Sequence, residues 1–284
     1  MKIPSKDQFS RIFDLISEFD HKRESELPDA IRDLRDNGEP TEVVTYLRLN
    51  YSLAATPEFE LLPGERIADR YTVENMIGAG GMGIVYRANQ DRTQRDVALK
   101  LVHPRLSTPE LLSRFEEEIV TLGKLDHPGI VHIFDADKHG DSVFFTMQLV
   151  DGQPLHRHIR EHALTRHQKL DLIIRLADAV QAAHDRGIIH RDLKPANILI
   201  DRTSGHPVIL DFGLATLAGA LLADDDQKIT GLSGTPNYMS PEQFLGTAGE
   251  FGVGQSIDVY ALGVIAFEIL AGHSPYRFPE DSSW

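Results

Sequence analysis

One short polar run, His190 to Asn197 with the sequence HRDLKPAN, places a carboxylate, an amine and an amide close together in the chain. Apolar runs flank it on both sides, at 188–189 and 198–200. We expect these runs to form two short strands that hold a rigid loop between them. In such a loop Asp192 can accept a proton, Lys194 can neutralise phosphate charge, and Asn197 can bind a hard metal ion through its oxygen.

Composition excludes several classes of protein. With 284 residues, 41% of them hydrophobic and 25% charged, the chain has the composition of a soluble globular protein with one large domain and an appendage or two modest domains. A net charge of −14 argues against a nucleic-acid partner, and the absence of cysteine excludes disulfides and thiol chemistry. The N-terminus has no signal-peptide pattern, and the longest apolar run, Val259 to Leu270, is too short to span a membrane. We therefore expect a cytoplasmic protein.

Residues 1–64 are predicted to form a helical extension, because apolar side chains recur at helical spacing from Phe9 to Phe19. Further short helices are expected after Pro28 and after Pro40. The extension either packs on the main domain, partly ordered, or acts as a docking or regulatory module. Nothing in its residues names a partner.

A glycine-rich run, Gly78 to Gly83, has the spacing G-x-G-x-x-G. A dinucleotide-binding fold would place a helix directly after it, but the residues from Ile84 to Ala88 favour a strand. The run is therefore predicted to be a hairpin between two strands, the first beginning at Tyr71, that either covers nucleotide phosphates with backbone amides or is a plain flexible turn.

A buried lysine is predicted in the next strand, 97–102, where Lys100 lies among apolar residues. A helix that begins near Ser107 or Thr108 follows. Of the three consecutive glutamates in this helix, 116–118, only Glu118 shares the apolar stripe of Leu111, Phe115 and Leu122. We assign Glu118 as the partner of Lys100, and we interpret the other two as surface charges.

Several later elements can also be predicted. A buried strand, 143–150, runs into a linker at 151–152, and a capping box, Thr165 to Gln168, opens a long helix that Gly187 ends. The apolar residues of this helix include Leu170, Ile173, Ile174, Ala177 and Val180. Three nearby histidines, 156, 158 and 162, do not share one helical face, so we do not interpret them as a metal site.

Taken in order, these motifs resemble those of bacterial eukaryotic-type (Hanks-type) serine/threonine protein kinases. The matching motifs are H-R-D-L-K-P-x-N at 190–197, D-F-G at 211–213, G-T-x-x-Y-x-x-P-E at 234–242 with Ser240 in place of the usual alanine, and a D-x-x-x-x-G helix at 258–263. The resemblance implies an α+β bilobal fold, with a β-rich N-lobe, a helical C-lobe and ATP between them. The predicted domains are the extension, 1–64, and a kinase domain, 71–284.

The resemblance also implies a role for each matching residue. Asp192 would orient the substrate hydroxyl and accept its proton, Lys194 would stabilise the transferring phosphoryl group, and Lys100 with Glu118 would position the α- and β-phosphates. Asn197 and Asp211 would hold Mg²⁺, or alternatively Mn²⁺. The residues expected to contact ATP are Ile77, Gly78, Ala79, Gly80, Gly81, Met82, Gly83, Val85, Ala98, Lys100, Met147 as gatekeeper, Gln148 and Leu149 through their backbones, and Leu199.

The implied activity is transfer of the γ-phosphoryl group of MgATP to serine or threonine hydroxyls of a protein, because Lys194 is typical of that specificity. Two alternatives are a catalytically impaired scaffold that binds ATP and a small-molecule phosphotransferase; the 235–242 ending, a platform for peptide substrates in the family, disfavours the second. We also hypothesise that a phosphate on Thr230 or Ser233 pairs with Arg191, which would make the chain a substrate of its own activity.

After the helix that starts near Asp258 the sequence departs from the family pattern, because only eight residues follow Tyr276. A complete C-lobe would continue with several more helices. We therefore expect a C-lobe that is incomplete, in a fragment of a longer kinase or in a natural short form, with apolar surface exposed on the last helix.

Overall fold

The computed structural model describes residues 60–80, 83–103, 122–140, 142–212, 236–244 and 254–276. These residues divide into two compact units. Of the described residues, 60–103 and 135–147 belong to the first unit, and 122–134, 148–212, 236–244 and 254–276 belong to the second. Several predictions fall outside the described residues: the helices of the N-terminal extension, Gly81, Met82, Glu118, Thr230 and Ser233. In the described part of the chain, no helix is both long and apolar enough to cross a bilayer.

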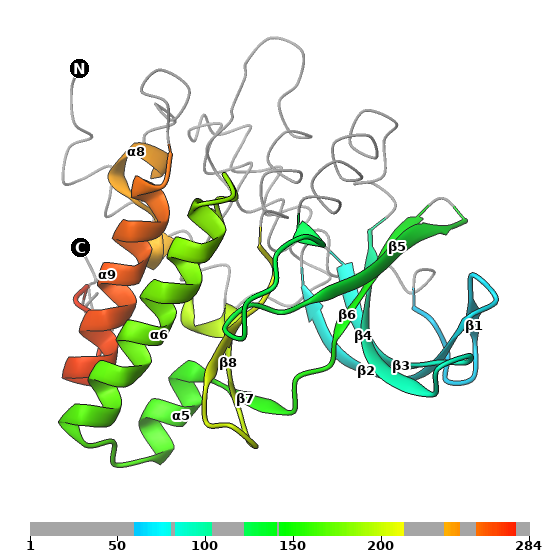
Figure 1. Ribbon diagram of the computed structural model, residues 1–284, viewed down its shortest axis with the longest axis horizontal. Coiled ribbons are helices and arrows are strands. Elements are labelled where there is room, and N and C mark those ends of the chain that lie inside the picture. Colours follow the sequence, from blue (N-terminus) through cyan, green and yellow to red (C-terminus); the bar gives the residue numbers. More distant parts are fainter. Residues whose placement is uncertain are drawn as a thin grey trace, which may run out of the picture. The chain divides into compact units, whose positions relative to one another are not determined.

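The first unit is built on a six-stranded sheet with the order β1-β2-β3-β4-β6-β5 (Figure 1). Its strands are β1 (Arg66–Ile67), β2 (Tyr71–Gly80), β3 (Gly83–Gln90), β4 (Arg95–Val102), β5 (Ile133–His139) and β6 (Ser142–Gln148). The strands expected from Tyr71, Ile84 and Val97 are therefore present. β1, which the sequence did not predict, lies between the two predicted domains and pairs with β2.

β2 and β3 form the predicted glycine-rich hairpin, and the register pairs Gly80 with Gly83 next to the turn. Gly83 has φ of +146°, and a Cβ atom added there would lie 2.0 Å from the carbonyl oxygen of Leu101 in β4. The hairpin can lie this close to β4 only because position 83 has no side chain.

A Gly83→Ala substitution should therefore destabilise the first unit by about 1–3 kcal/mol, because it combines an unfavourable φ with a backbone clash. Gly78→Ala is the matched control in the same hairpin, since no atom lies within 4 Å of the position of its added Cβ. Urea denaturation of both variants measures the difference. Equal unfolding free energies for the two would contradict the close approach of β3 and β4.

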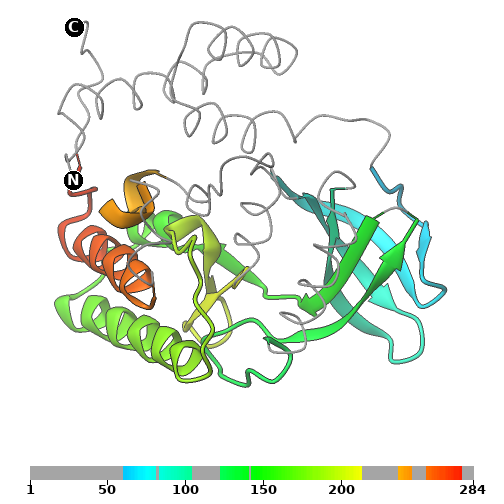
Figure 2. The same cartoon turned by 90° about the horizontal axis from the view of Figure 1, so that it is seen from above.

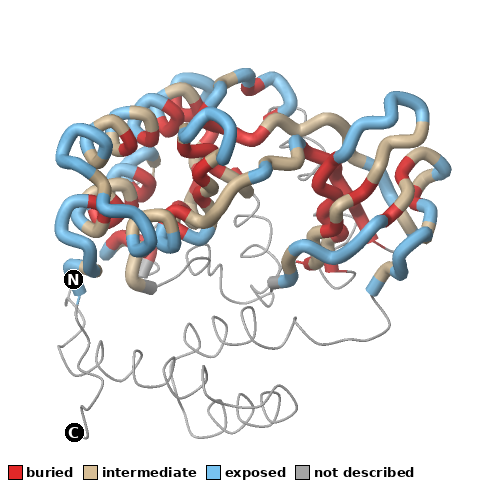
Figure 3. The backbone as a smooth tube through the Cα atoms, turned by 90° about the horizontal axis from the view of Figure 1, so that it is seen from below, coloured by how far each residue is buried: buried red, intermediate tan, exposed pale blue. Residues whose placement is uncertain are grey.

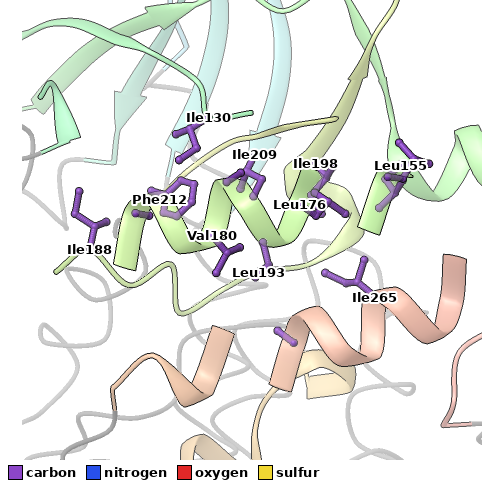
Figure 4. Packing of buried hydrophobic residues seen from close by; sticks show 14 of the residues in the cluster. Ile130, Leu155, Leu176, Val180, Ile188, Leu193, Ile198, Ile209, Phe212 and Ile265 are labelled. Atoms are coloured by element: carbon purple, nitrogen blue, oxygen red, sulfur yellow. The ribbon is translucent and has the colours of Figure 1, made fainter. Parts of the chain in front are cut away.

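The second unit combines helices with a three-stranded sheet of order β7-β8-β9. Its elements are β7 (Gly152–Pro154), α5 (Leu155–Glu161), α6 (Arg166–His184), η4 (Pro195–Asn197), β8 (Ile198–Asp201), β9 (Pro207–Ile209), η5 (Pro236–Tyr238), α8 (Pro241–Phe244) and α9 (Ser256–Ala271). α6 and α9 run side by side in Figures 1 and 2. The buried core of this unit, red in Figure 3 and close up in Figure 4, includes Leu176, Val180, Leu193, Ile209 and Ile265.

α6 has the predicted ends. Thr165 and Gln168 form the capping box at its start. At its end Gly187 has φ of +75°, the N–H of Gly187 donates to His184 O, and the N–H of Ile188 donates to Ala183 O. These two bonds are those of a Schellman motif, which ends the helix just before the loop 190–197.

One detail of the prediction for this region is wrong. Ile188 and Ile189 do not form a strand, because the N–H of Ile188 is used to terminate α6. Of the apolar residues named for α6, Leu170 and Ile174 are 41% and 66% exposed. The helix buries Leu172, Leu176, Ala179, Val180, Ala183 and His184.

Candidate active site

The loop 190–197, which we call the catalytic loop, brings its three predicted functional side chains together. Lys194 Nζ lies 2.9 Å from Asp192 Oδ2. Asn197 Nδ2 donates to the backbone oxygen of Asp192 at 2.8 Å and to Asp192 Oδ2 at 3.2 Å. The carboxylate is therefore held in one orientation by a cation and an amide, so a substrate hydroxyl would meet a preorganised proton acceptor.

A buried carboxylate on α9 anchors this loop. Asp258, which is fully buried, accepts hydrogen bonds from the backbone N–H groups of His190 (2.8 Å) and Arg191 (2.9 Å). His184 of α6 donates its Nε2–H to the same carboxylate at 2.8 Å. The D-x-x-x-x-G helix at 258–263 thus holds the loop through its first residue. His184 was not predicted.

His190 connects the loop to Asp211. Its Nε2 donates to Leu210 O at 2.8 Å, since a carbonyl oxygen can only accept, and its Nδ1 accepts the N–H of Asp192 at 3.3 Å. The ring also packs against Phe212, with a centroid distance of 4.7 Å. Both Asp211 and Arg191 have the left-handed backbone conformation, with φ of +55° and +65°. Such strained residues persist only where surrounding contacts hold them, as is common at functional sites.

The predicted metal ligands lie at one end of the β8–β9 ladder. Ile198 pairs with Ile209, and the N–H of Leu210 donates to Asn197 O at 2.8 Å, so Asp211 follows directly after this pairing. The Nδ2 of Asn197 is directed to Asp192, so its Oδ1 points the other way. Among the described residues no group of three acidic, histidine or cysteine side chains gathers as a metal site. A carboxylate and an amide oxygen nevertheless fit Mg²⁺, which completes its shell with water and phosphate oxygens.

In the first unit the strand pairing places several residues that are predicted to contact ATP next to one another. Val85 of β3 pairs with Gly78 of β2 and with Lys100 of β4. Lys100 is only 5% exposed, and its Nζ lies 6.0 Å from the ring centroid of Phe145. Ala98 is buried, whereas Ile77 is 48% exposed.

The predicted adenine contacts include Met147 and the two residues that follow it. Met147, the predicted gatekeeper, is buried at the end of β6. The N–H of Gln148 donates to His132 O at 2.9 Å, so Gln148 offers its carbonyl oxygen rather than its N–H to a ligand. Leu199 lies in β8 of the second unit, paired with Val208.

The 235–242 ending, which the family resemblance implies is a platform for peptide substrates, is attached to α9 through Tyr238. Tyr238 donates its hydroxyl to the carboxylate of Glu268, 3.0 Å from Oε1 and 3.1 Å from Oε2. Burial raises the pKa of Glu268, and burial together with the carboxylate raises the pKa of Tyr238. The folded chain therefore binds the Glu268 proton more tightly than the unfolded chain does.

A Glu268→Gln substitution should accordingly increase the unfolding free energy near neutral pH, because it removes an ionised carboxyl from a half-buried site while its amide oxygen still accepts from Tyr238. Because the pKa of Glu268 is higher in the folded chain than in the unfolded chain, ionisation of Glu268 destabilises the folded chain above its folded pKa. This destabilisation disappears as the pH falls toward the ordinary pKa of a glutamate. The difference in unfolding free energy between the variant and the unchanged chain should therefore decrease as the pH is lowered from about 7.5 to about 5.

Denaturant titrations across this pH range measure the effect. Glu161→Gln is the control, because Arg157 lowers the pKa of Glu161 and the sign of its effect is opposite. An advantage of Glu268→Gln that is independent of pH would contradict the assignment.

Comparison of the sequence with known protein families shows to which family this chain belongs. The protein kinase domain family matches residues 71–283. The chain belongs to this family. Members of the family use ATP and a divalent metal ion, which agrees with the donor set at Asn197 and Asp211.

Individual relatives of this kinase domain are bacterial. It is 36% identical over 231 residues to the serine/threonine-protein kinase pkn3 of Myxococcus xanthus, covering 78% of this chain and 41% of that protein. It is 35% identical to PrkC of Bacillus subtilis, covering 76% of this chain and 32% of PrkC. The kinase domain therefore spans less than half the length of these relatives. The crystal structure of the Mycobacterium tuberculosis PknI kinase domain superposes with a TM-score of 0.60 at 26% identity, covering 79% of this chain and 81% of that one.

Proposed function

We propose that this kinase domain transfers the γ-phosphoryl group of MgATP to serine or threonine hydroxyls of a protein substrate. The observation that carries the proposal is the loop in which Asp192 is oriented by Lys194 and Asn197 and anchored through Asp258. The serine/threonine kinases pkn3 and PrkC, at 36% and 35% identity, support the reaction class.

Asp192 and Lys194 have distinct roles in the proposed reaction. The Asp192 carboxylate accepts the hydrogen bond of the attacking hydroxyl, directs its oxygen at the γ-phosphorus and takes up its proton as the bond to phosphorus forms. The Lys194 ammonium, 2.9 Å from that carboxylate, stabilises negative charge on the transferring group. As the bond from the γ-phosphorus to the β-phosphate oxygen breaks, ADP leaves with the electron pair.

Asn197 and Asp211 supply the oxygen ligands for a divalent ion. When bound, Mg²⁺ or Mn²⁺ neutralises phosphate charge. Lys100, with Glu118, binds the α- and β-phosphates, and the backbone of the hairpin from Ile77 to Gly83 covers them. The adenine ring is bound next to Met147 by the backbones of Gln148 and Leu149, between apolar contacts from Val85, Ala98 and Leu199.

Self-phosphorylation at Thr230 or Ser233 is part of the proposal. The supporting observation is the sequence pattern, which places both hydroxyls in the segment before 234–242. The cation proposed to pair with the phosphate is Arg191. Mass spectrometry of chain incubated with MgATP tests it directly: unmodified Thr230 and Ser233 in active protein would refute self-phosphorylation at these positions.

Transfer of label from ATP radiolabelled on its γ-phosphate tests the main proposal. The chain is incubated with Mg²⁺ and casein, and hydrolysed product is separated into phosphoamino acids; Asp192→Asn provides the background. We expect phosphoserine or phosphothreonine in casein. Bound nucleotide without transfer would favour an ATP-binding scaffold, and transfer only to added small-molecule alcohols would favour a small-molecule phosphotransferase. Either result would refute the proposal.

A further inference from the structure

The short helix α8 begins with its own capping box. Ser240 precedes the helix, and its backbone N–H donates to Gln243 Oε1 at 3.1 Å. In return the N–H of Gln243 donates to Ser240 Oγ at 3.4 Å. This is the reciprocal S-x-x-Q arrangement in which each side chain satisfies a backbone group of the other residue. Ser240, the residue that departs from the usual alanine, is therefore one half of a pair with Gln243.

The capping box leaves the amide nitrogen of Gln243 available for a third contact. Gln243 Nε2 donates to the backbone oxygen of Arg191, in the catalytic loop, at 2.9 Å. The orientation of the amide is fixed by both contacts, because a flipped amide would place Nε2 against the N–H of Ser240 and Oε1 against the Arg191 oxygen. Gln243 is 4% exposed and Ser240 is fully buried, so water does not compete for these bonds.

The Arg191 residue is consequently held on both sides. Its N–H donates to Asp258 Oδ1 at 2.9 Å, and its carbonyl accepts from Gln243. The residue between these two contacts has φ of +65°, a conformation that a non-glycine residue keeps only when its surroundings impose it. Asp192 follows immediately, so the direction of its carboxylate depends on the Arg191 peptide.

We propose that Gln243 is a positioning residue for catalysis: together with Asp258 it clamps Arg191 in the left-handed conformation and so aims Asp192. The inference rests on the proposed kinase function for its kinetic consequence. The Ser240–Gln243 capping box gives the clamp its rigidity, because it prevents rotation of the amide that contacts Arg191. The side chain of Gln243 thereby joins α8 to the catalytic loop.

Gln243→Glu separates the clamp from the cap. A glutamate oxygen can still accept the N–H of Ser240, as in other capping boxes, but an ionised carboxylate cannot donate to Arg191 O and repels it. Gln168→Glu is the matched control, since the exposed Gln168 occupies the same position in the capping box of α6 and forms its hydrogen bonds with Thr165. Gln243→Met, which removes the donor without adding charge, is the second variant if Gln243→Glu does not fold.

Two measurements test the clamp. Steady-state kinetics should show that kcat of the Gln243 variant falls at least about tenfold while KM for ATP stays within about twofold, because misdirection of a catalytic group affects the chemical step. Hydrogen exchange followed by mass spectrometry should show faster exchange of the Arg191 and Asp192 amides. Gln168→Glu should change neither quantity.

The exchange measurement does not need activity, so it tests the clamp even if the unchanged chain transfers no phosphate, a result that would overturn only the proposed function. Unchanged exchange at Arg191 and Asp192 would overturn the clamp. So would a kcat within about twofold of the unchanged chain, because a loop that keeps its geometry loses no rate.

Discussion

An Asp192→Asn chain is expected to transfer phosphoryl groups about 10²–10⁴-fold more slowly than the unchanged chain. The asparagine amide cannot take up the proton of the substrate hydroxyl. Its oxygen can, however, occupy the place of Oδ2 and keep the contacts with Lys194 and Asn197. The substitution therefore removes the proton acceptor while the loop that surrounds it remains intact.

Single-turnover transfer measures the rate, and calorimetric titration with ATP and Mg²⁺ measures binding. We expect an affinity within about threefold of the unchanged chain, since Asp192 is not assigned to the nucleotide. Asp151→Asn, an exposed position in the same unit, is the control and should leave both quantities unchanged. A transfer rate that survives Asp192→Asn would show that another group accepts the proton.

The chemistry of the site could be predicted because its residues are adjacent in sequence. Asp192, Lys194 and Asn197 lie within one loop, and the structure brings the same three side chains within hydrogen-bonding distance. The glycine hairpin was predictable for a similar reason, because the strand pattern after Gly83 distinguishes it from a strand–helix turn. The pairing of Glu118 with Lys100 remains a prediction.

The residues that hold the catalytic loop in place are harder to predict from the sequence, because they come from distant parts of the chain. His184 and Asp258 are 74 residues apart in sequence. One signal was present: His184 is a polar residue on the same face of α6 as Leu176, Val180 and Ala183, where a buried hydrogen bond is required. Gln243 also had a signal, the S-x-x-Q spacing of a capping box from Ser240 to Gln243.

Some features could not be predicted because their sequence patterns fit two structures. α6 carries two overlapping apolar stripes, and periodicity alone does not decide which one faces the core; tertiary packing buries Leu172 and Leu176 and leaves Ile174 exposed. The pair Ile188–Ile189 has a strand-like composition, but the Schellman motif at Gly187 uses the N–H of Ile188. In both places contacts beyond the local sequence determined the outcome.

An Asp258→Asn substitution should lower kcat by about 10–10²-fold, because small displacements of a catalytic group are sufficient for such losses. Oδ2 of Asp258 accepts from His190 and His184, and Oδ1 accepts from Arg191. The asparagine oxygen can replace Oδ2 and keep two of these bonds, but its NH₂ group then faces the N–H of Arg191. The loss is therefore concentrated on the strained residue that precedes Asp192.

The unfolding free energy should fall by about 1–3 kcal/mol, the cost of one unsatisfied buried donor. Asp201→Asn is the control: Asp201 also accepts backbone N–H groups, from Thr203 and Ser204, but in the exposed turn between β8 and β9. Stopped-flow kinetics and urea denaturation of both variants give the two quantities. If Asp258→Asn loses stability but keeps its kcat, the anchor stabilises the fold without positioning Asp192. If it loses kcat and ATP affinity in equal measure, the effect of the anchor extends beyond the loop, because misplacing Asp192 alone leaves the nucleotide contacts in place.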